Sequence, residues 1–125
     1  MIFGIGLDTT TLSRFEDLAE NEKFINRILT EREKEDFYAL SQNKKANFLA
    51  KRFSAKEAFA KALGTGISAT FGFHSISIIK TKENAPKIVM NDERLKANFT
   101  ECFVSFSDEK LGKDKLISSI VILEK

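Results

Sequence analysis

One long helical pattern dominates this sequence and restricts the folds that it can adopt. Residues 45–63 place apolar side chains in most directions around a helix axis, and Gly64 follows as a residue type that commonly ends helices. We therefore expect a helix that is buried on most of its surface. The whole chain has 125 residues, which fits one compact domain and is too short for two ordinary ones.

The opening residues predict a strand with two unlike faces. Over residues 2–8, every second position shares a face of the strand. One face carries Phe3, Ile5 and Leu7, and the other carries Ile2, Gly4, Gly6 and Asp8. The second face is largely bare backbone that ends in a carboxylate. Residues 9–11, all threonine, are expected to form a turn and a helix cap.

The remaining patterns predict short helices and strands in an irregular order. We expect helices over 12–20, 31–40 and 92–99, a short apolar turn over 24–29, and strands over 73–80, 87–90, 102–107 and 116–123. Ser13 with Glu16, and Thr30 with Glu33, have the spacing of a capping box, and Asn91 is a candidate cap. Strands and helices do not alternate regularly, so the predicted fold class is α+β.

The composition excludes several kinds of site and partner. One cysteine and one histidine are too few for a Cys/His zinc cluster or a disulfide, so any metal must be a hard ion held by oxygen. The net charge of +2 is too small for a protein that coats nucleic acid. No stretch approaches the roughly 20 apolar residues of a membrane span. An acidic residue by position 8 argues against a secretory leader. We therefore expect a cytoplasmic protein without a nucleic-acid or membrane partner.

Asp8 is the first candidate functional residue. It ends the predicted strand after Gly4-Ile5-Gly6-Leu7, where the glycines leave space and a carboxylate can bind a hard cation. An acidic residue at a strand end is more often a turn residue or a helix cap. The residues alone leave both interpretations open.

Glu57 is the second candidate and lies on the long helix. At 100° per residue, it falls within about 60° of Ala50, Ser54 and Lys61. The small side chains on this helix face leave space for a ligand. A carboxylate and an ammonium beside that space are suited to bind one. The alternative is an exposed Glu57–Lys61 pair, which contributes about 0.3–0.5 kcal/mol on a helix surface.

The distribution of charge favours the ligand-binding interpretation. Residues 41–61 carry six cations against one carboxylate, a net charge of +5, so the rest of the chain carries −3. The six cations are Lys44, Lys45, Lys51, Arg52, Lys56 and Lys61. Such an excess beside one carboxylate suits a phosphate group bound together with a metal. The turn Gly64-Thr65-Gly66 adds accessible backbone N–H groups, but it has neither the Walker nor the dinucleotide-binding spacing.

Three segments resemble one known family. Residues 4–16 (GIGLDTTTLSRFE) resemble the opening motif of the holo-acyl-carrier-protein synthases, the small class of 4′-phosphopantetheinyl transferases. Residues 47–67 (NFLAKRFSAKEAFAKALGTGI) resemble the most diagnostic motif of that family at every position, and VSFSDEK with SSIVILE resembles its closing hairpin. The resemblance implies a single transferase domain over residues 1–125, with the fold of that family: helices packed on a mostly antiparallel sheet.

The resemblance also implies a reaction and a metal. Family members transfer 4′-phosphopantetheine from coenzyme A to a serine hydroxyl of apo acyl carrier protein, in fatty-acid biosynthesis, and release adenosine 3′,5′-bisphosphate. The serine attacks the β-phosphorus, and Mg²⁺ bridges the phosphates. By matching positions, Asp8 and Glu57 would bind Mg²⁺, and Lys61 would neutralise the pyrophosphate. Glu57, directly or through a metal-bound water, would take the serine proton.

Other matching positions imply contacts with both substrates and with further copies of the chain. The positions implied for coenzyme A are Arg52, Lys61, Gly64, Gly66 and Pro86, of which Arg52 can bond a phosphate in a bidentate way. Arg14 matches an arginine that faces acidic residues of the carrier protein. Family members are usually homotrimers with active sites between subunits, which agrees with a small chain rich in phenylalanine.

The chain departs from the family at positions other than Asp8, Glu57 and Lys61. Phe103 stands where many relatives have histidine, and Thr11 stands where they often have an acidic residue. Neither side chain can replace the group that those relatives carry. A non-catalytic module that binds coenzyme A or acyl carrier protein is therefore an alternative function. Transfer to carrier domains of a larger synthase is a second alternative.

Overall fold

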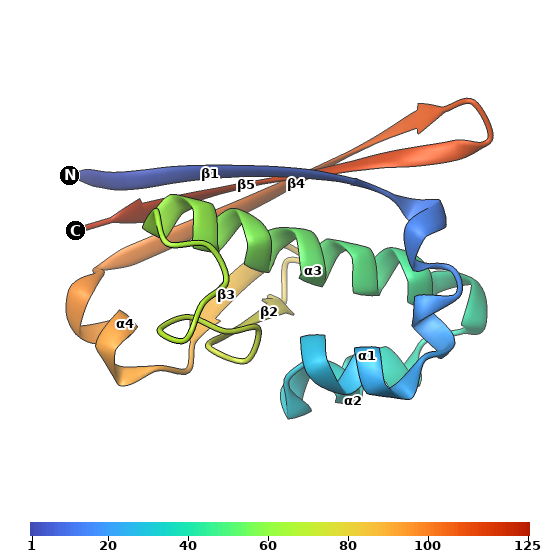
Figure 1. The fold of residues 1–125 in the computed structure, drawn as a ribbon, viewed down its shortest axis with the longest axis horizontal. Coiled ribbons are helices and arrows are strands. Elements are labelled where there is room, and N and C mark those ends of the chain that lie inside the picture. Colours follow the sequence, from blue (N-terminus) through green and yellow to red (C-terminus); the bar gives the residue numbers. More distant parts are fainter.

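Helix α3, Gln42–Leu63, is the longest element, and the strands of two antiparallel sheets lie along it (Figure 1). The computed structural model describes residues 1–125. One sheet has the order β1–β5–β4, formed by Ile2–Thr11, Asp114–Glu124 and Glu101–Leu111. The other sheet pairs β2, Ile76–Lys80, with β3, Pro86–Met90.

Short helices fill the connections between these elements. They are the 3-10 helices η1, Leu12–Phe15, and η2, Leu18–Glu20, and the α-helices α1, Glu22–Ile28, α2, Glu31–Ala39, and α4, Glu93–Asn98. Every strand pair is antiparallel, so the predicted α+β class is confirmed. The two chain ends lie side by side, where the N-terminal amine of Met1 donates to the Lys125 carbonyl (3.0 Å) (Figure 1).

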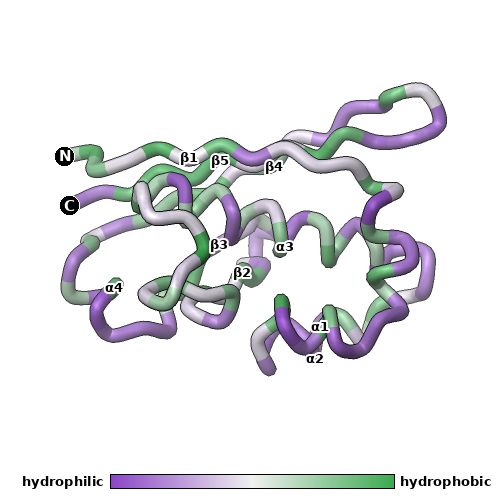
Figure 2. Tube along the Cα trace, in the orientation of Figure 1, coloured by the Kyte–Doolittle hydropathy of each residue, from purple (hydrophilic) through white to green (hydrophobic).

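Strand β1 turns its bare backbone face, which carries Gly4 and Gly6, toward α3. A Cβ added to Gly6 would lie 1.7 Å from the carbonyl oxygen of Ala58, and one added to Gly4 would lie 2.0 Å from that of Ala62. Only glycine allows the strand and the helix to approach this closely. The apolar face of the strand therefore points outward, and Leu7 on that face is 60% exposed. Figure 2 shows hydrophobic segments along this strand.

We expect Gly6→Ala to destabilise the fold by about 2–3 kcal/mol, because a methyl group there overlaps helix backbone that cannot move aside alone. Chemical unfolding of both proteins measures the change. Gly72→Ala is the matched control, since an added Cβ at that position meets no atom within 4 Å. Equal stability of the two variants would contradict the close approach of β1 to α3.

Strand β1 is longer than its alternation predicts, and the predicted turn over residues 9–11 is wrong. Thr9 pairs with Ser118, and Thr11 pairs with Leu116 of β5. Threonine is β-branched and suits a strand, so pairing with a neighbouring strand outweighs its tendency to cap helices. Asp8 therefore lies inside a paired strand rather than at its end, and it is neither a turn residue nor a helix cap.

The helix predicted over residues 12–20 is wrong, because two short 3-10 helices replace it. The capping box expected from Ser13 and Glu16 does not form, since Thr11 occupies the N-cap position and Ser13 bonds to Asp114 instead. The turn predicted over 24–29 is largely the helix α1. By contrast, the capping box of Thr30 and Glu33 forms in full at the start of α2.

The C-terminal half matches the predicted elements with shifted ends. Strand β2 begins at Ile76 rather than at residue 73, and Asp92 rather than Asn91 caps α4. Strands β4 and β5 form a longer hairpin than expected, because most of the polar stretch between them pairs as well. The turn is thereby reduced to Gly112 and its neighbour Lys113, and the hairpin extends beyond the rest of the sheet (Figure 1).

The core consists of two apolar clusters that share α3. The C-terminal half of the helix packs with β2, β3 and β5, and the N-terminal half packs with α1, α2 and η1. Lys56 lies inside this core, although it is one of the six cations of residues 41–61. Its Nζ is 2.5 Å from Oε1 of Glu33 and 2.6 Å from the carbonyl oxygen of Ile28, and both charged side chains are fully buried. Lys56 is therefore a structural cation rather than part of a phosphate-binding surface.

Candidate functional site

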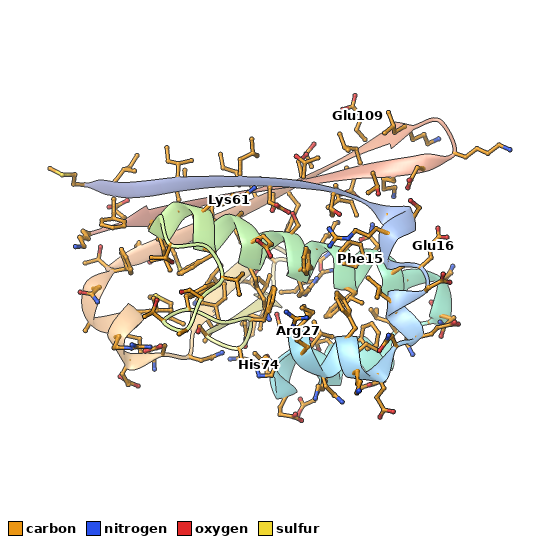
Figure 3. All side chains as sticks on the ribbon, in the orientation of Figure 1. Phe15, Glu16, Arg27, Lys61, His74 and Glu109 are labelled. Atoms are coloured by element: carbon orange, nitrogen blue, oxygen red, sulfur yellow. The ribbon has the colours of Figure 1, made fainter.

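Asp8 of β1 and Lys61 of α3 meet where the strand runs alongside the helix. The Nζ atom of Lys61 lies 3.3 Å from Oδ1 of Asp8 and donates to the carbonyl oxygen of Leu7 at 3.0 Å. The Asp8 side chain is 14% exposed and that of Lys61 is 53% exposed. Figure 3 shows Lys61 between the helix and the strand. The cation of this site is thus accessible, and its carboxylate is largely covered.

Glu57 lies one turn before Lys61 on the same helix, and its charge is coupled to both residues. Burial raises the pKa of the Glu57 carboxyl, and the negative charge of Asp8 raises it further. The positive charges of Lys61 and Arg14 act in the opposite direction. The carboxylates of Asp8 and Glu57 therefore share one region of the molecule.

The exposed Glu57–Lys61 pair is not the arrangement that forms. Lys61 makes its ion pair with Asp8, on another element, and not with Glu57 on its own helix. Helix spacing places Glu57 and Lys61 on one face of the helix but carries no information about a strand that packs along that face. The Asp8–Lys61 pair could have been inferred only from the glycines that bring β1 onto the helix.

Two buried serines lie beneath Asp8. The Oγ atoms of Ser54 and Ser119 are 2.7 Å apart, and the Ser54 hydroxyl also donates to the main-chain oxygen of Asp8 at 3.5 Å. Ser119 is the pairing partner of Asp8 on β5. Helix spacing predicts that Ser54 shares a face with Glu57, whereas no local pattern points to Ser119. The serine pair links the strand that carries Asp8 to the helix that carries Glu57.

The chemistry of this donor set fits a divalent metal bound together with a substrate. No cluster of three or more His, Cys, Asp or Glu side chains exists in the chain, so a closed all-protein metal cage is absent. The negative charge of Asp8 raises the pKa of the Glu57 carboxyl, and a hard cation bound between the two side chains would offset that repulsion. Mg²⁺ is commonly held by one or two carboxylates, with phosphates and water completing its shell. Asp8 and Glu57 match that pattern.

Arg14 lies on η1, at the side of this site. Its guanidinium carbon is 4.9 Å from the ring centre of Phe53 and 5.5 Å from that of Phe15. Phe53 precedes Glu57 by one helical turn, and the charge of Arg14 lowers the pKa of Glu57. The structure therefore brings Arg14 to an exposed surface next to the candidate site, as the resemblance implied.

Arg52 and Pro86 lie together in a different place. Arg52 is five positions before Glu57, which turns their side chains about 140° apart around the helix. The guanidinium of Arg52 stacks on the ring of Phe48 at 3.6 Å, and burial lowers its pKa to about 10, so it stays cationic. Arg52 and Pro86 line one pocket, which is completed by Lys51, Ile78, Lys80, Asn84, Val104, Ser105 and Phe106. One chain therefore does not bring these two residues to Asp8 and Lys61.

Gly64 and Gly66 follow directly after Lys61 and have an open surface. Both have positive φ angles, 84° and 67°, and no atom would meet a Cβ added to either. The N–H groups of Gly64, Thr65 and Gly66 all donate to the carbonyl oxygen of Ala60. The expectation that these N–H groups are accessible is therefore wrong, because they end the helix. A ligand could use only the space that the missing side chains leave.

Comparisons with known proteins agree with the resemblance. A family model described as the 4′-phosphopantetheinyl transferase superfamily matches residues 4–114. A holo-[acyl-carrier-protein] synthase of Geobacillus sp. (strain WCH70) is 53% identical over 92 residues, which are 73% of this chain and 77% of that protein. No helix of this chain has both the length and the apolar character to cross a membrane.

Two solved structures have the same fold. The holo-[acyl-carrier-protein] synthase from Neisseria meningitidis is 36% identical with a TM-score of 0.87, and the match covers 100% of both chains. A synthase from Bacillus anthracis str. Ames, in complex with CoA (3′,5′-ADP), is 33% identical with a TM-score of 0.78. That match covers 100% of this chain and 99% of the other.

Proposed function

This chain belongs to the 4′-phosphopantetheinyl transferase superfamily, as an enzyme of the holo-[acyl-carrier-protein] synthase type, and from that premise we propose roles for its residues. The enzyme transfers 4′-phosphopantetheine from coenzyme A to acyl carrier protein. We assign the transfer to the site of Asp8, Glu57 and Lys61. The observation that carries this assignment is the convergence of two carboxylates and an accessible ammonium from two different elements.

In the proposed mechanism, the hydroxyl of the carrier-protein serine attacks the β-phosphorus of coenzyme A. The bond to the adenosine 3′,5′-bisphosphate breaks, and that group leaves with the electron pair. Glu57, directly or through a water molecule, takes the serine proton. Lys61, more than half exposed, offsets the negative charge that develops on the leaving group.

Asp8 and Glu57 are the residues that would hold Mg²⁺. The carboxylate pair and the absence of any third metal-binding side chain support this choice over zinc or calcium held by protein alone. A bound Mg²⁺ would neutralise negative charge on the pyrophosphate. The pair of Ser54 and Ser119 keeps the backbone of Asp8 in place against α3.

Two copies of the chain would complete each active site, within a homotrimer. Arg52 and Pro86, proposed to bind coenzyme A, lie in a pocket apart from Asp8 and Lys61, so one copy would supply each half. The outer face of the β1–β5–β4 sheet also carries exposed apolar side chains, which a neighbouring copy would cover. They include Ile5, Leu7, Phe103 and Ile120.

A shared site predicts recovery of activity when two inactive variants are combined. We expect mixed assemblies of Glu57→Gln and Arg52→Lys, unfolded and refolded together in equal amounts, to regain about a quarter of the wild-type activity. One intact half comes from each variant, and random assembly joins the two intact halves in about a quarter of the sites. Sedimentation of the wild-type protein checks for the trimer. No recovery on mixing would contradict the shared site.

The remaining parts of the proposal concern the partner and the setting. Arg14, on an exposed surface beside Glu57, would bind acidic side chains of the carrier protein. We propose that the whole chain, residues 1–125, is a single transferase domain that serves fatty-acid biosynthesis in the cytoplasm. The single family match over residues 4–114 supports one domain.

The test is conversion of apo acyl carrier protein, followed by mass spectrometry. We expect the carrier protein to gain one phosphopantetheine in the presence of coenzyme A and Mg²⁺. A chelator should stop the reaction, and added Mg²⁺ should restore it. Binding of coenzyme A or carrier protein without any mass gain would overturn the proposal and support the non-catalytic module instead. Unchanged turnover with the chelator would overturn the metal assignment alone.

A further inference from the structure

The tip of the β4–β5 hairpin is bonded to η1, directly beside Arg14. Asp114, the first residue of β5, accepts two hydrogen bonds from Ser13 of η1. The Ser13 N–H donates to Oδ1 at 3.0 Å, and the Ser13 hydroxyl donates to Oδ2 at 2.5 Å. Both carboxylate oxygens of Asp114 therefore accept hydrogen bonds from Ser13, which is 101 positions earlier in the sequence.

Helix η1 depends on this external carboxylate. It has only four residues, and a 3-10 helix of that length has poor internal hydrogen bonds. Its N-cap residue, Thr11, makes no side-chain bond to the free N–H groups of the first turn. Asp114 supplies the missing acceptor, and the Ser13 bonds in turn lower the pKa of the Asp114 carboxyl below its ordinary value. The carboxylate thus stays charged near neutral pH.

The hydrogen bonds between Asp114 and Ser13 fix the position of Arg14, the next residue of η1. It follows Ser13 in the chain, and its guanidinium lies over the ring of Phe53 on α3, one turn from Glu57. If η1 moves, the guanidinium leaves both the ring and the edge of the active site. A neighbouring carboxylate on the same hairpin, Glu109, points away from η1 into solvent (Figure 3).

We propose that Asp114 is a positioning residue for carrier-protein docking, because it fixes η1 and thereby presents Arg14 beside Glu57. This inference rests on the proposed function, in which Arg14 binds acidic side chains of the carrier protein. In this proposal Asp114 acts through Arg14 rather than by contacting a substrate. The hairpin, which forms an extension of the sheet, thus gains a part in recognition of the protein substrate.

Steady-state kinetics with the full chain test the proposal. We expect Asp114→Ala to raise the KM for acyl carrier protein roughly three- to tenfold, while kcat and the KM for coenzyme A stay within about twofold. The double variant Arg14→Ala/Asp114→Ala should be no worse than Arg14→Ala alone, because Asp114 acts through Arg14. Asp114→Asn keeps an acceptor oxygen and should give an intermediate KM. Glu109→Gln, the matched control, should leave all three parameters unchanged.

Other results would overturn the inference in recognisable ways. Additive effects of Arg14→Ala and Asp114→Ala would show that Asp114 acts by another route. An equal loss in kcat and in both KM values would indicate a structural role alone. A wild-type KM for the carrier protein in Asp114→Ala would contradict the proposal. If Asp114→Ala has a lower melting temperature than the wild type, the folded Asp114→Asn variant is measured instead. A wild-type KM in that variant would contradict the proposal in the same way. If Arg14→Ala leaves that KM unchanged, the docking role in the proposed function fails as well.

Discussion

Glu57→Gln is expected to lower the rate of phosphopantetheine transfer by at least about a hundredfold. The amide has the shape of the carboxylate, but it carries no charge to hold a cation and cannot take the serine proton. The variant should remain folded, because the Glu57 side chain is partly exposed and makes no hydrogen bond or ion pair within the chain. Mass spectrometry of the carrier protein measures the rate, and thermal unfolding checks the fold.

A matched variant and an independent measurement accompany this result. Glu35→Gln, on the exposed side of α2, should transfer at the wild-type rate. Asp8→Asn should lose transfer as Glu57→Gln does, and it should also lower the pKa of Glu57 in the metal-free protein, because the charge of Asp8 raises it. Carboxyl NMR titration reports that shift without any turnover. A fully active Asp8→Asn or Glu57→Gln variant would show that the transfer site lies elsewhere.

Lys56→Met is expected to destabilise the fold by about 3–5 kcal/mol. That change corresponds to a fall in melting temperature of roughly 10–20 °C for a chain of this length. Methionine fits the volume of the lysine stem, but it leaves the charge of Glu33 buried without its partner. Burial lowers the pKa of Lys56 and the charge of Glu33 opposes that effect, so the two charges depend on each other.

The comparison for this variant is Lys34→Met. Lys34 pairs with exposed Glu31 at 3.0 Å, and loss of such a surface pair should cost less than about 1 kcal/mol. The double variant Glu33→Gln/Lys56→Met removes both buried charges and should lose less stability than Lys56→Met alone. If Lys34→Met and Lys56→Met melted at the same temperature, the buried pair would contribute nothing to the fold.

Elements that rest on local signals could be predicted from the sequence. The apolar surface of α3, its end at Gly64 and the capping box of Thr30 and Glu33 depend on residues within one or two turns of each other. The alternation of β1 can also be read from the sequence, although its glycines by themselves indicate only free space beside Asp8. The sequence did not reveal that the apolar face of β1 points outward, because periodicity separates two faces without saying which one meets the core.

Features that depend on distant pairing could not be predicted. The strand at residues 9–11 forms because β5 lies beside it, and η1 forms against Asp114 of the far hairpin. The burial of Lys56 could not be predicted either, because its partner, Glu33, is 23 positions away in the sequence. For the candidate site, the resemblance selected Asp8, Glu57 and Lys61, and the structure joins them, while their catalytic roles stay predictions.

The adjacency of Met1 and Lys125 makes the chain nearly a closed ring. The two ends are hydrogen-bonded through their backbones, so a short linker could join them without stretching β1 or β5. A circular permutant opened at the exposed turn over residues 82–85 would keep every strand pair of both sheets. The ammonium of Lys125 lies over the rings of Phe3 and Phe99, so a peptide tag fused after this residue would start beside them.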